Sequence, residues 1–305
     1  MLKNLIKNLI SRAKSFHFKL RFEHYLLLPA IIVLLLLAIY PLICALNTTL
    51  YNVFLTKPIE RTFIGLQNYI YVVQDPRFVS GLSRSLYFVI LAVGGSFILG
   101  LGISLLLHRE IRGKSIIRTC LIIPMVMTPV IVGYTFMFML DSSLGVVNIS
   151  LKFLGQPGHP FLGDPSTALT TTALVDIWQW TPFVVLVLLA ALESLPQAPF
   201  EAAKIEGASR WQVFRYLTLP SLKPAAAIVI LIRLMDAFRV FDTIYIMTQG
   251  GPGLASETLP LYIWRSGFSW FHTSRSTVMG LIMLFIIMVI CWIFFRKVVA
   301  GRGGT

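Results

Sequence analysis

Six apolar stretches, each long enough to cross a lipid bilayer, constrain this chain more than any other feature of its sequence. They lie near residues 26–47, 85–107, 119–140, 170–192, 223–247 and 275–295. A helix rises 1.5 Å per residue, so about 20 apolar residues span the roughly 30 Å of hydrocarbon in a bilayer. Hydrophobic residues make up 56% of the chain and charged residues only 13%, which is more apolar surface than a soluble domain can hide. The sequence therefore predicts an all-α membrane protein with six transmembrane helices.

The basic residues stand mostly at the ends of these apolar stretches. A net charge of +13 invites a nucleic-acid interpretation, but that function needs a basic face with interleaved aromatic side chains, so we expect no nucleic-acid partner. The positive-inside rule places the basic segment 1–24 in the cytoplasm. Alternation then places three more basic groups on the same side: Arg109, Arg112, Lys114 and Arg118; Lys204, Arg210, Arg215 and Lys223; and Arg296, Lys297 and Arg302. We expect one six-span domain over 25–299, a cytoplasmic tail at 300–305, and both termini inside.

Residues 193–222 form a polar and amphipathic insert between the fourth and fifth apolar stretches. Its Glu-Ala-Ala segment suits a short helix, which Gly207 is expected to end because glycine tolerates the backbone angles of a helix terminus. Ser209 is a candidate N-cap for a second helical stretch, and Pro220 and Pro224 are expected to restart the chain into the next span. An ordinary connector needs only polar residues. A folded module at this place instead suggests a docking surface for a soluble partner.

The insert resembles the EAA loop of the permease subunits of bacterial ABC importers. The resemblance rests on Glu-Ala-Ala, then Glu-Gly-Ala, then Phe214, Pro220 and Pro224 in family spacing. The family usually has Asp where this chain has Glu206, which leaves the charge unchanged. The resemblance implies a coupling helix that sits in a cleft of an ATP-hydrolysing subunit. The residues to which it assigns ATPase coupling are Glu201, Ala202, Ala203, Glu206, Gly207, Ala208, Phe214 and Pro220.

Charged residues recur every three positions in the fifth apolar stretch, as Arg233, Asp236, Arg239 and Asp242. On one helix these steps bring each cation beside an anion. An ionised side chain facing lipid near mid-bilayer costs roughly 2.5–3.5 kcal/mol even on the lenient insertion scale. Two interpretations stay open: ion pairs that fix the register between spans, or the lining of a water-filled substrate path.

The fourth stretch supplies candidates for the facing wall of such a path. Indole faces stack on sugar rings, and carboxylates and amides bond to hydroxyls, although tryptophan near an interface is also an ordinary aromatic-belt residue. The candidate pathway residues are Asp176, Trp178, Gln179, Trp180, Arg233, Asp236, Arg239, Asp242 and Tyr245.

Two further segments, 63–69 (FIGLQNY) and 241–252 (FDTIYIMTQGGP), resemble elements of carbohydrate-uptake permeases of the maltose and glycerol-phosphate type. The resemblance implies the MetI-like permease fold of ABC importers in the bacterial cytoplasmic (inner) membrane. It also implies four partners: a second homologous permease, two ABC ATPase subunits that use ATP and Mg, and an extracytoplasmic solute-binding protein. The implied substrate is a disaccharide, oligosaccharide or glycosylated polyol. A sugar phosphate held by Arg233 or Arg239 is the alternative.

The sequence has no complete ATP-binding or hydrolytic motif. Residues 113–115, Gly-Lys-Ser, are only the end of a P-loop pattern, with His108 where its first glycine belongs, and the three cysteines lack zinc-site spacing. We therefore expect no catalytic site, no metal site and no cofactor in this chain. An ion-coupled carrier or channel, with Asp236 and Asp242 binding protons or sodium, is the alternative function.

Overall fold

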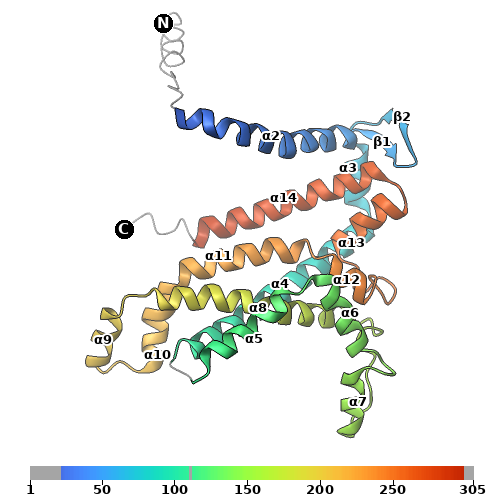
Figure 1. Ribbon diagram of the computed structural model, residues 1–305. Helices are drawn as coiled ribbons and strands as arrows, with labels where there is room; N and C mark the ends of the chain where they lie inside the picture. The colour runs from blue at the N-terminus through green and yellow to red at the C-terminus, as the bar shows by residue number, and fades with distance from the viewer. Residues whose placement is uncertain (1–21, 110–111, 299–305) are drawn as a thin grey trace, which may run out of the picture.

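The computed structural model describes residues 22–109 and 112–298, which form an elongated bundle of helices (Figure 1). Most of the expected N-terminal segment and the expected tail at 300–305 lie outside the described residues. Within them, five helical segments are long and apolar enough to cross a membrane. They are α2 (Phe22–Thr49), α4 (Pro76–Leu107), α8 (Ala168–Glu193), α11 (Leu219–Phe238) with the turns that precede it, and α14 (Thr273–Val298).

The third apolar stretch is not the single straight span that the sequence predicts. It forms α5 (Lys114–Val126) and α6 (Pro129–Met139), which are bent by 96° relative to each other. Met127 and Thr128 are extended, and Pro129 cannot donate to a continuing helical ladder. The Thr128 hydroxyl then caps α6 by accepting from the backbone N–H of Ile131. The described chain therefore has six spans only if this bent pair counts as one.

The fifth apolar stretch, expected at 223–247, is divided as well. The helix α11 ends at Phe238, and α12 (Asp242–Met247) begins after a short break. At its other end, α10 (Arg210–Val213), a π-helical turn (Phe214–Thr218) and α11 run on as one helical segment. The expected restart at Pro220 and Pro224 is therefore wrong. Pro220 falls in the first turn of α11, where helices tolerate proline.

The core of the bundle is the contact between α4 and α8. Small residues of α4 let the two backbones approach, and a Cβ on Gly100 would lie 2.6 Å from the side chain of Val184. Close approach of this kind favours helix association where lipid removes the hydrophobic drive. Phe88 of α4, Phe238 of α11 and Ile244 of α12 then form one buried cluster. This cluster holds the two broken halves of the fifth stretch against the α4–α8 pair.

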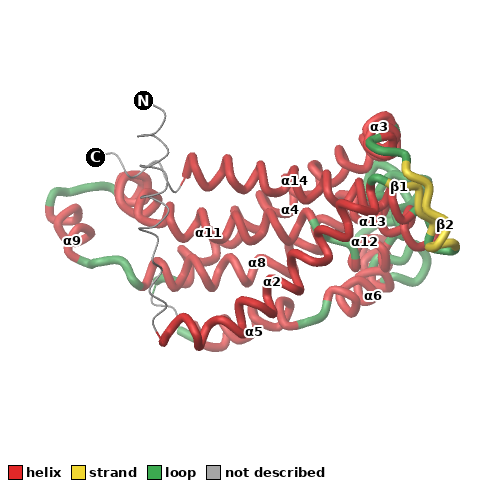
Figure 2. Tube along the Cα trace, turned by 90° about the horizontal axis from the view of Figure 1, so that it is seen from above, coloured by secondary structure: helices red, strands yellow, loops and turns green. Residues whose placement is uncertain are grey.

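The two ends of the bundle differ (Figure 2). At one end α9 (Ala198–Ile205) projects on its loops beyond the long helices. At the other end lies an antiparallel hairpin in which Tyr51 is opposite Phe63. The remaining elements are β1 (Tyr51–Phe54), β2 (Lys57–Phe63), α3 (Gln67–Gln74), α7 (Val146–Phe153), α13 (Leu259–Trp264) and a π-helical turn (Arg265–Ser269).

Large apolar side chains cover much of the outer surface. None of the residues in the most apolar part of α2 is buried. Leu34 and Leu37, for example, are 66% and 72% exposed. Soluble monomers rarely expose a continuous apolar surface of this size to water. The α2 surface is suited to lipid or to a neighbouring helix.

Candidate pathway and coupling sites

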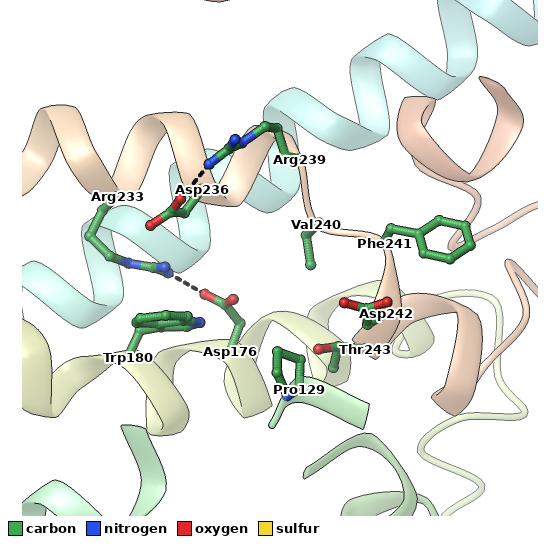
Figure 3. A pocket seen from close by; sticks show the side chains of 10 residues that line it. All are labelled: Pro129, Asp176, Trp180, Arg233, Asp236, Arg239, Val240, Phe241, Asp242 and Thr243. Carbon is green, nitrogen blue, oxygen red and sulfur yellow. Dashed lines mark hydrogen bonds and ion pairs between the residues drawn. The ribbon is translucent and has the colours of Figure 1, made fainter. Parts of the chain in front are cut away.

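A cavity of about 300 Å³ lies where α6, α8, α11 and α12 meet (Figure 3). Three carboxylates and two guanidinium groups face it from helices that are otherwise apolar. Its lining residues are Pro129, Asp176, Trp180, Arg233, Asp236, Arg239, Val240, Phe241, Asp242 and Thr243. The cavity therefore joins the charged residues of the fifth apolar stretch to two of the four residues proposed from the fourth.

An ion pair between Asp176 of α8 and Arg233 of α11 forms the deepest wall of this cavity. The Arg233 Nη2 donates to Oδ1 of Asp176, and the two side chains are only 1% and 5% exposed. The guanidinium also lies over the Trp180 ring, 5.3 Å from its centroid. The Nε and Nη1 groups of Arg233 have no hydrogen-bond partner among the described residues. Two buried donors are thus free to bond to a guest in the cavity.

The second ion pair is local and wetter. Arg239 Nη2 donates to Oδ1 of Asp236 at 2.8 Å, and the two side chains are 66% and 34% exposed, respectively. Arg239 caps α11 rather than lying within it, and Asp242 opens α12 without an ion pair to any described residue. The expectation of one helix with four alternating charges is therefore wrong. Arg233 pairs across the bundle with Asp176 of α8, although Asp236 lies three residues along the same helix. Asp242 is separated from the pattern because α11 ends at Phe238.

Three of the proposed pathway residues do not line the cavity. Trp178 packs edge-on against Phe136 with ring centroids 5.0 Å apart, Gln179 donates from Nε2 to the Met127 carbonyl at 3.0 Å, and Tyr245 stacks on Phe241. A helix turns by about 100° per residue. Residues 176 and 180 therefore share a face, whereas residues 178 and 179 point elsewhere.

Four lining residues are not among those expected from the sequence: Pro129, Val240, Phe241 and Thr243. Val240 and Phe241 lie between α11 and α12, Thr243 lies in α12, and Pro129 begins α6 after the bend. Helical periodicity gives no signal at such breaks. Pro129, placed inside an apolar stretch, was the one residue that could have indicated a bend.

Six of the eight proposed coupling residues lie on α9 or directly after it, at the projecting end of the bundle. Phe214 begins the π-helical turn, and Pro220 lies in the first turn of α11. Glu201, Ala202 and Ala203 belong to α9, and Gly207 follows it with φ +78°. Ser209 begins α10 with a capping box: its hydroxyl accepts from the Gln212 N–H, and the Gln212 side chain accepts from the Ser209 N–H. The expected short helix, its glycine terminator and the serine N-cap are all confirmed.

The outer surface of this loop is unusually apolar for an exposed turn. Ile205, Trp211 and Tyr216 are 87%, 68% and 73% exposed. Large apolar and aromatic side chains surrounded by polar ones are typical of protein–protein contacts. None of these three side chains is among the coupling residues expected from the sequence.

The end of the bundle opposite α9 contains a buried charge cluster that the sequence analysis also missed. The Glu257 side chain is fully buried, and Arg77 Nε and Nη2 each donate to its carboxylate at 2.7 Å. Arg265 pairs with the same carboxylate, and Arg84 Nη1 donates to the Glu257 carbonyl at 3.0 Å. One carboxylate thus ties the loop before α13 to the start of α4 and to the π-helical turn after α13. These residues are up to 188 positions apart in the chain, so no local pattern links them.

The family relationship is decided by a match over residues 96–300. This segment matches the model of the family described as binding-protein-dependent transport system inner membrane component. The chain belongs to this family. It is therefore a non-catalytic transport subunit of an ABC importer and a multi-pass inner membrane protein. ATP use in this family is a property of separate ATPase subunits.

Relatives that match most of the chain agree with this family assignment. The chain is 35% identical to a trehalose/maltose transport system permease protein of Thermococcus litoralis, and the match covers 83% of this chain and 85% of the relative. It is 30% identical to the trehalose transport system permease protein of Mycobacterium tuberculosis, with 96% and 94% covered. A chain in the crystal structure of a bacterial ABC transporter involved in the import of the acidic polysaccharide alginate has the same fold, with a TM-score of 0.80. The two chains are 24% identical, and the match covers 92% of this chain and 96% of the other.

Proposed function

We propose that this permease translocates a sugar through the Asp176–Arg233 cavity as half of a pathway completed by a second, homologous permease. Two ABC ATPase subunits that bind ATP and Mg drive it, and an extracytoplasmic solute-binding protein delivers the sugar. The observation that carries the proposal is the cavity itself. It combines an indole face, free guanidinium donors and carboxylate acceptors among membrane-spanning helices, which is the chemistry that sugar rings and hydroxyls require.

The charge balance of the cavity favours an uncharged sugar. Arg233 is neutralised by Asp176 and Arg239 by Asp236, which leaves the Asp242 carboxylate without a cation among the described residues. An anionic sugar would meet this carboxylate and would find no cation among the described lining residues that lacks an ion pair. A neutral disaccharide, oligosaccharide or glycosylated polyol fits better than a sugar phosphate, and two relatives are named for trehalose or maltose transport.

Coupling would pass through one continuous helical segment. Residues Arg210 to Phe238 run without a break from the α9 loop to the cavity, a length of about 44 Å at 1.5 Å per residue. We propose that the apolar face around Ile205 and Trp211 docks on an ATPase subunit, so that closure of the ATPases tilts this segment. The cavity would then open alternately to each side of the membrane. In this orientation α9 and both termini are cytoplasmic.

The test is to purify the assembled transporter with its binding protein and to measure which sugars stimulate ATP hydrolysis. We expect neutral sugars to stimulate and sugar phosphates to fail. Asp242→Asn should reduce the preference for neutral over anionic sugars, whereas Asp164→Asn, which removes a partly exposed carboxylate outside the cavity, should leave it unchanged. Stimulation by sugar phosphates alone would overturn the assignment.

A further inference from the structure

A second cavity, of about 650 Å³, lies between the ends of α4 and α8 and the α9–α10 loop. Its apolar walls include Leu105, Leu192, Leu195, Phe200 and Phe214. Its basic or titratable lining residues are His108, Arg109, Lys204 and Arg210. The cavity does not include Asp176 or Arg233, so it is separate from the proposed sugar pathway.

The charge of this cavity is one-sided. None of its lining residues is acidic, and Arg109, Lys204 and Arg210 form no ion pair with any described residue. The nearby cations Lys114 and Arg118, in contrast, share the Glu193 carboxylate. Three cations around one hollow, none of them paired with a described residue, repel one another unless an anion enters. The missing partner is therefore an anion with enough apolar surface to cover the leucine and phenylalanine walls.

The position of the cavity indicates where this anion comes from. The spans α4 and α8 end at Leu107 and Glu193, so the cavity lies at the level where both leave the hydrocarbon. Lipid headgroups occupy that level of a membrane. We infer that the cavity binds an anionic phospholipid, with its phosphate at Arg109, Lys204 and Arg210 and an acyl chain along the apolar wall. Guanidinium groups suit phosphate because they donate in pairs.

Such a lipid would join the ends of two spans to the loop that we propose for ATPase docking. Its headgroup would contact Arg109 beyond α4 and Lys204 of α9 at once. The inference rests on the proposed cytoplasmic orientation of this loop, where anionic lipids concentrate. It does not depend on the identity of the sugar.

The experiment uses the assembled transporter in phosphatidylcholine nanodiscs with increasing phosphatidylglycerol. Native mass spectrometry counts the phosphatidylglycerol molecules that each complex retains. For Arg109→Gln combined with Arg210→Gln, we expect the half-saturating fraction of phosphatidylglycerol to rise about fivefold per lost cation. This factor corresponds to the roughly 1 kcal/mol that one Lys or Arg contributes near an anionic surface. The matched control is Arg215→Gln with Lys223→Gln, which removes two cations of the same region that do not line the cavity.

Three outcomes would overturn the inference. An equal shift in the control would mean general surface attraction. Binding of inorganic phosphate that fills the cavity in nanodiscs of pure phosphatidylcholine would mean that the cavity binds a soluble anion. Loss of ATPase subunits from the double variant at every lipid composition would mean that these cations contact an acidic protein surface. If the double variant fails to assemble, the exposed Lys204→Gln variant repeats the measurement with one cation removed. Lipid retention is measured without transport. The result can therefore be interpreted even if the proposed sugar pathway is wrong.

Discussion

At the scale of single residues, Asp176 and Arg233 are the pair whose loss should matter most. Arg233→Gln leaves a buried carboxylate without its cation, which costs about 3–5 kcal/mol in comparable buried pairs. We expect a large fall in the melting temperature of the assembled complex. Adding Asp176→Asn should restore most of it, because both charges are then gone.

The control for this prediction is Arg239→Gln. This side chain is 66% exposed, and exposed pairs contribute at most about 1 kcal/mol, so the melting temperature should hardly change while sugar transport falls. Equal losses of stability in the two single variants would contradict the distinction between the buried Asp176–Arg233 pair and the exposed Asp236–Arg239 pair.

Gly207 is expected to matter through its backbone alone. Its φ is +78°, and no atom lies within 4 Å of the place a Cβ would occupy. Alanine there costs about 1–2 kcal/mol of backbone strain, whereas proline cannot adopt the conformation at all. We expect Gly207→Ala to slow uptake modestly and Gly207→Pro to abolish it, with the protein still inserted in both. Membrane fractionation and uptake by the reconstituted complex measure the two effects.

The matched control is Gly113, which has φ +81° and equally open surroundings but lies outside the docking loop. Gly113→Ala carries the same strain and should leave uptake near the normal rate. A comparable loss of uptake would attribute the effect of Gly207 to strain in general rather than to the loop.

At the scale of elements, the contact between α4 and α8 depends on glycines of α4 that face α8, and Gly100 is one of them. A Cβ at Gly100 would meet Val184 at 2.6 Å, whereas Gly102, two residues away on the same helix, has open space around it. Overpacking costs about 1–3 kcal/mol. We therefore expect Gly100→Ala to lower the melting temperature of the complex and Gly102→Ala to leave it unchanged or slightly higher. The reverse order would mean that the two helices do not pack in this register.

The attachment of the β1–β2 hairpin should depend on pH through His272. Its ring packs against Phe54 with centroids 4.7 Å apart, and burial, followed by the charge of Arg275, lowers the pKa of its imidazole below 6.5. A base with a lowered pKa in the folded state contributes its full stability above the unfolded value of 6.5. That contribution is lost as the pH falls through the folded value.

Hydrogen exchange at Leu55, whose N–H donates to the Phe271 carbonyl at 2.9 Å, reports this attachment. After correction for intrinsic exchange rates, its protection should be lower at pH 5 than at pH 7.5. His272→Gln should remove the difference. Protection that is the same at both pH values in the unmodified protein would contradict the prediction.

At the scale of the whole molecule, this chain should not transport by itself. An ABC permease subunit moves solute only when separate ATPases drive it, so sealed liposomes that contain the chain alone should show no uptake. Adding the second permease, the ATPases, the binding protein and internal ATP should restore it. Uptake by the chain alone under a proton or sodium gradient would instead support an ion-coupled carrier, with Asp242 as its first candidate site.

Much of this architecture could be predicted because its signals are local. Twenty apolar residues mark a span wherever they occur, Gly207 and Ser209 mark the ends of short helices, and the Glu-Ala-Ala pattern carries the family resemblance within one loop. The division of the fifth stretch after Phe238 had no such signal. Neither glycine nor proline stands at the break, and packing of Phe238 and Ile244 in the shared core accompanies it.

The sequence by itself determined that this chain lies in a membrane, which apolar stretches are candidates to cross it and which loop carries the family resemblance. Composition and short-range pattern are sufficient for these properties, because lipid imposes the same demand on every span. Only the tertiary structure decided that Asp176 meets Arg233, that Glu257 gathers three arginines and that cations without an ion pair among the described residues line the second cavity. Each of these arrangements joins residues from different segments of the chain. Their meeting depends on the rotation and register of packed helices, which no local stretch of sequence encodes.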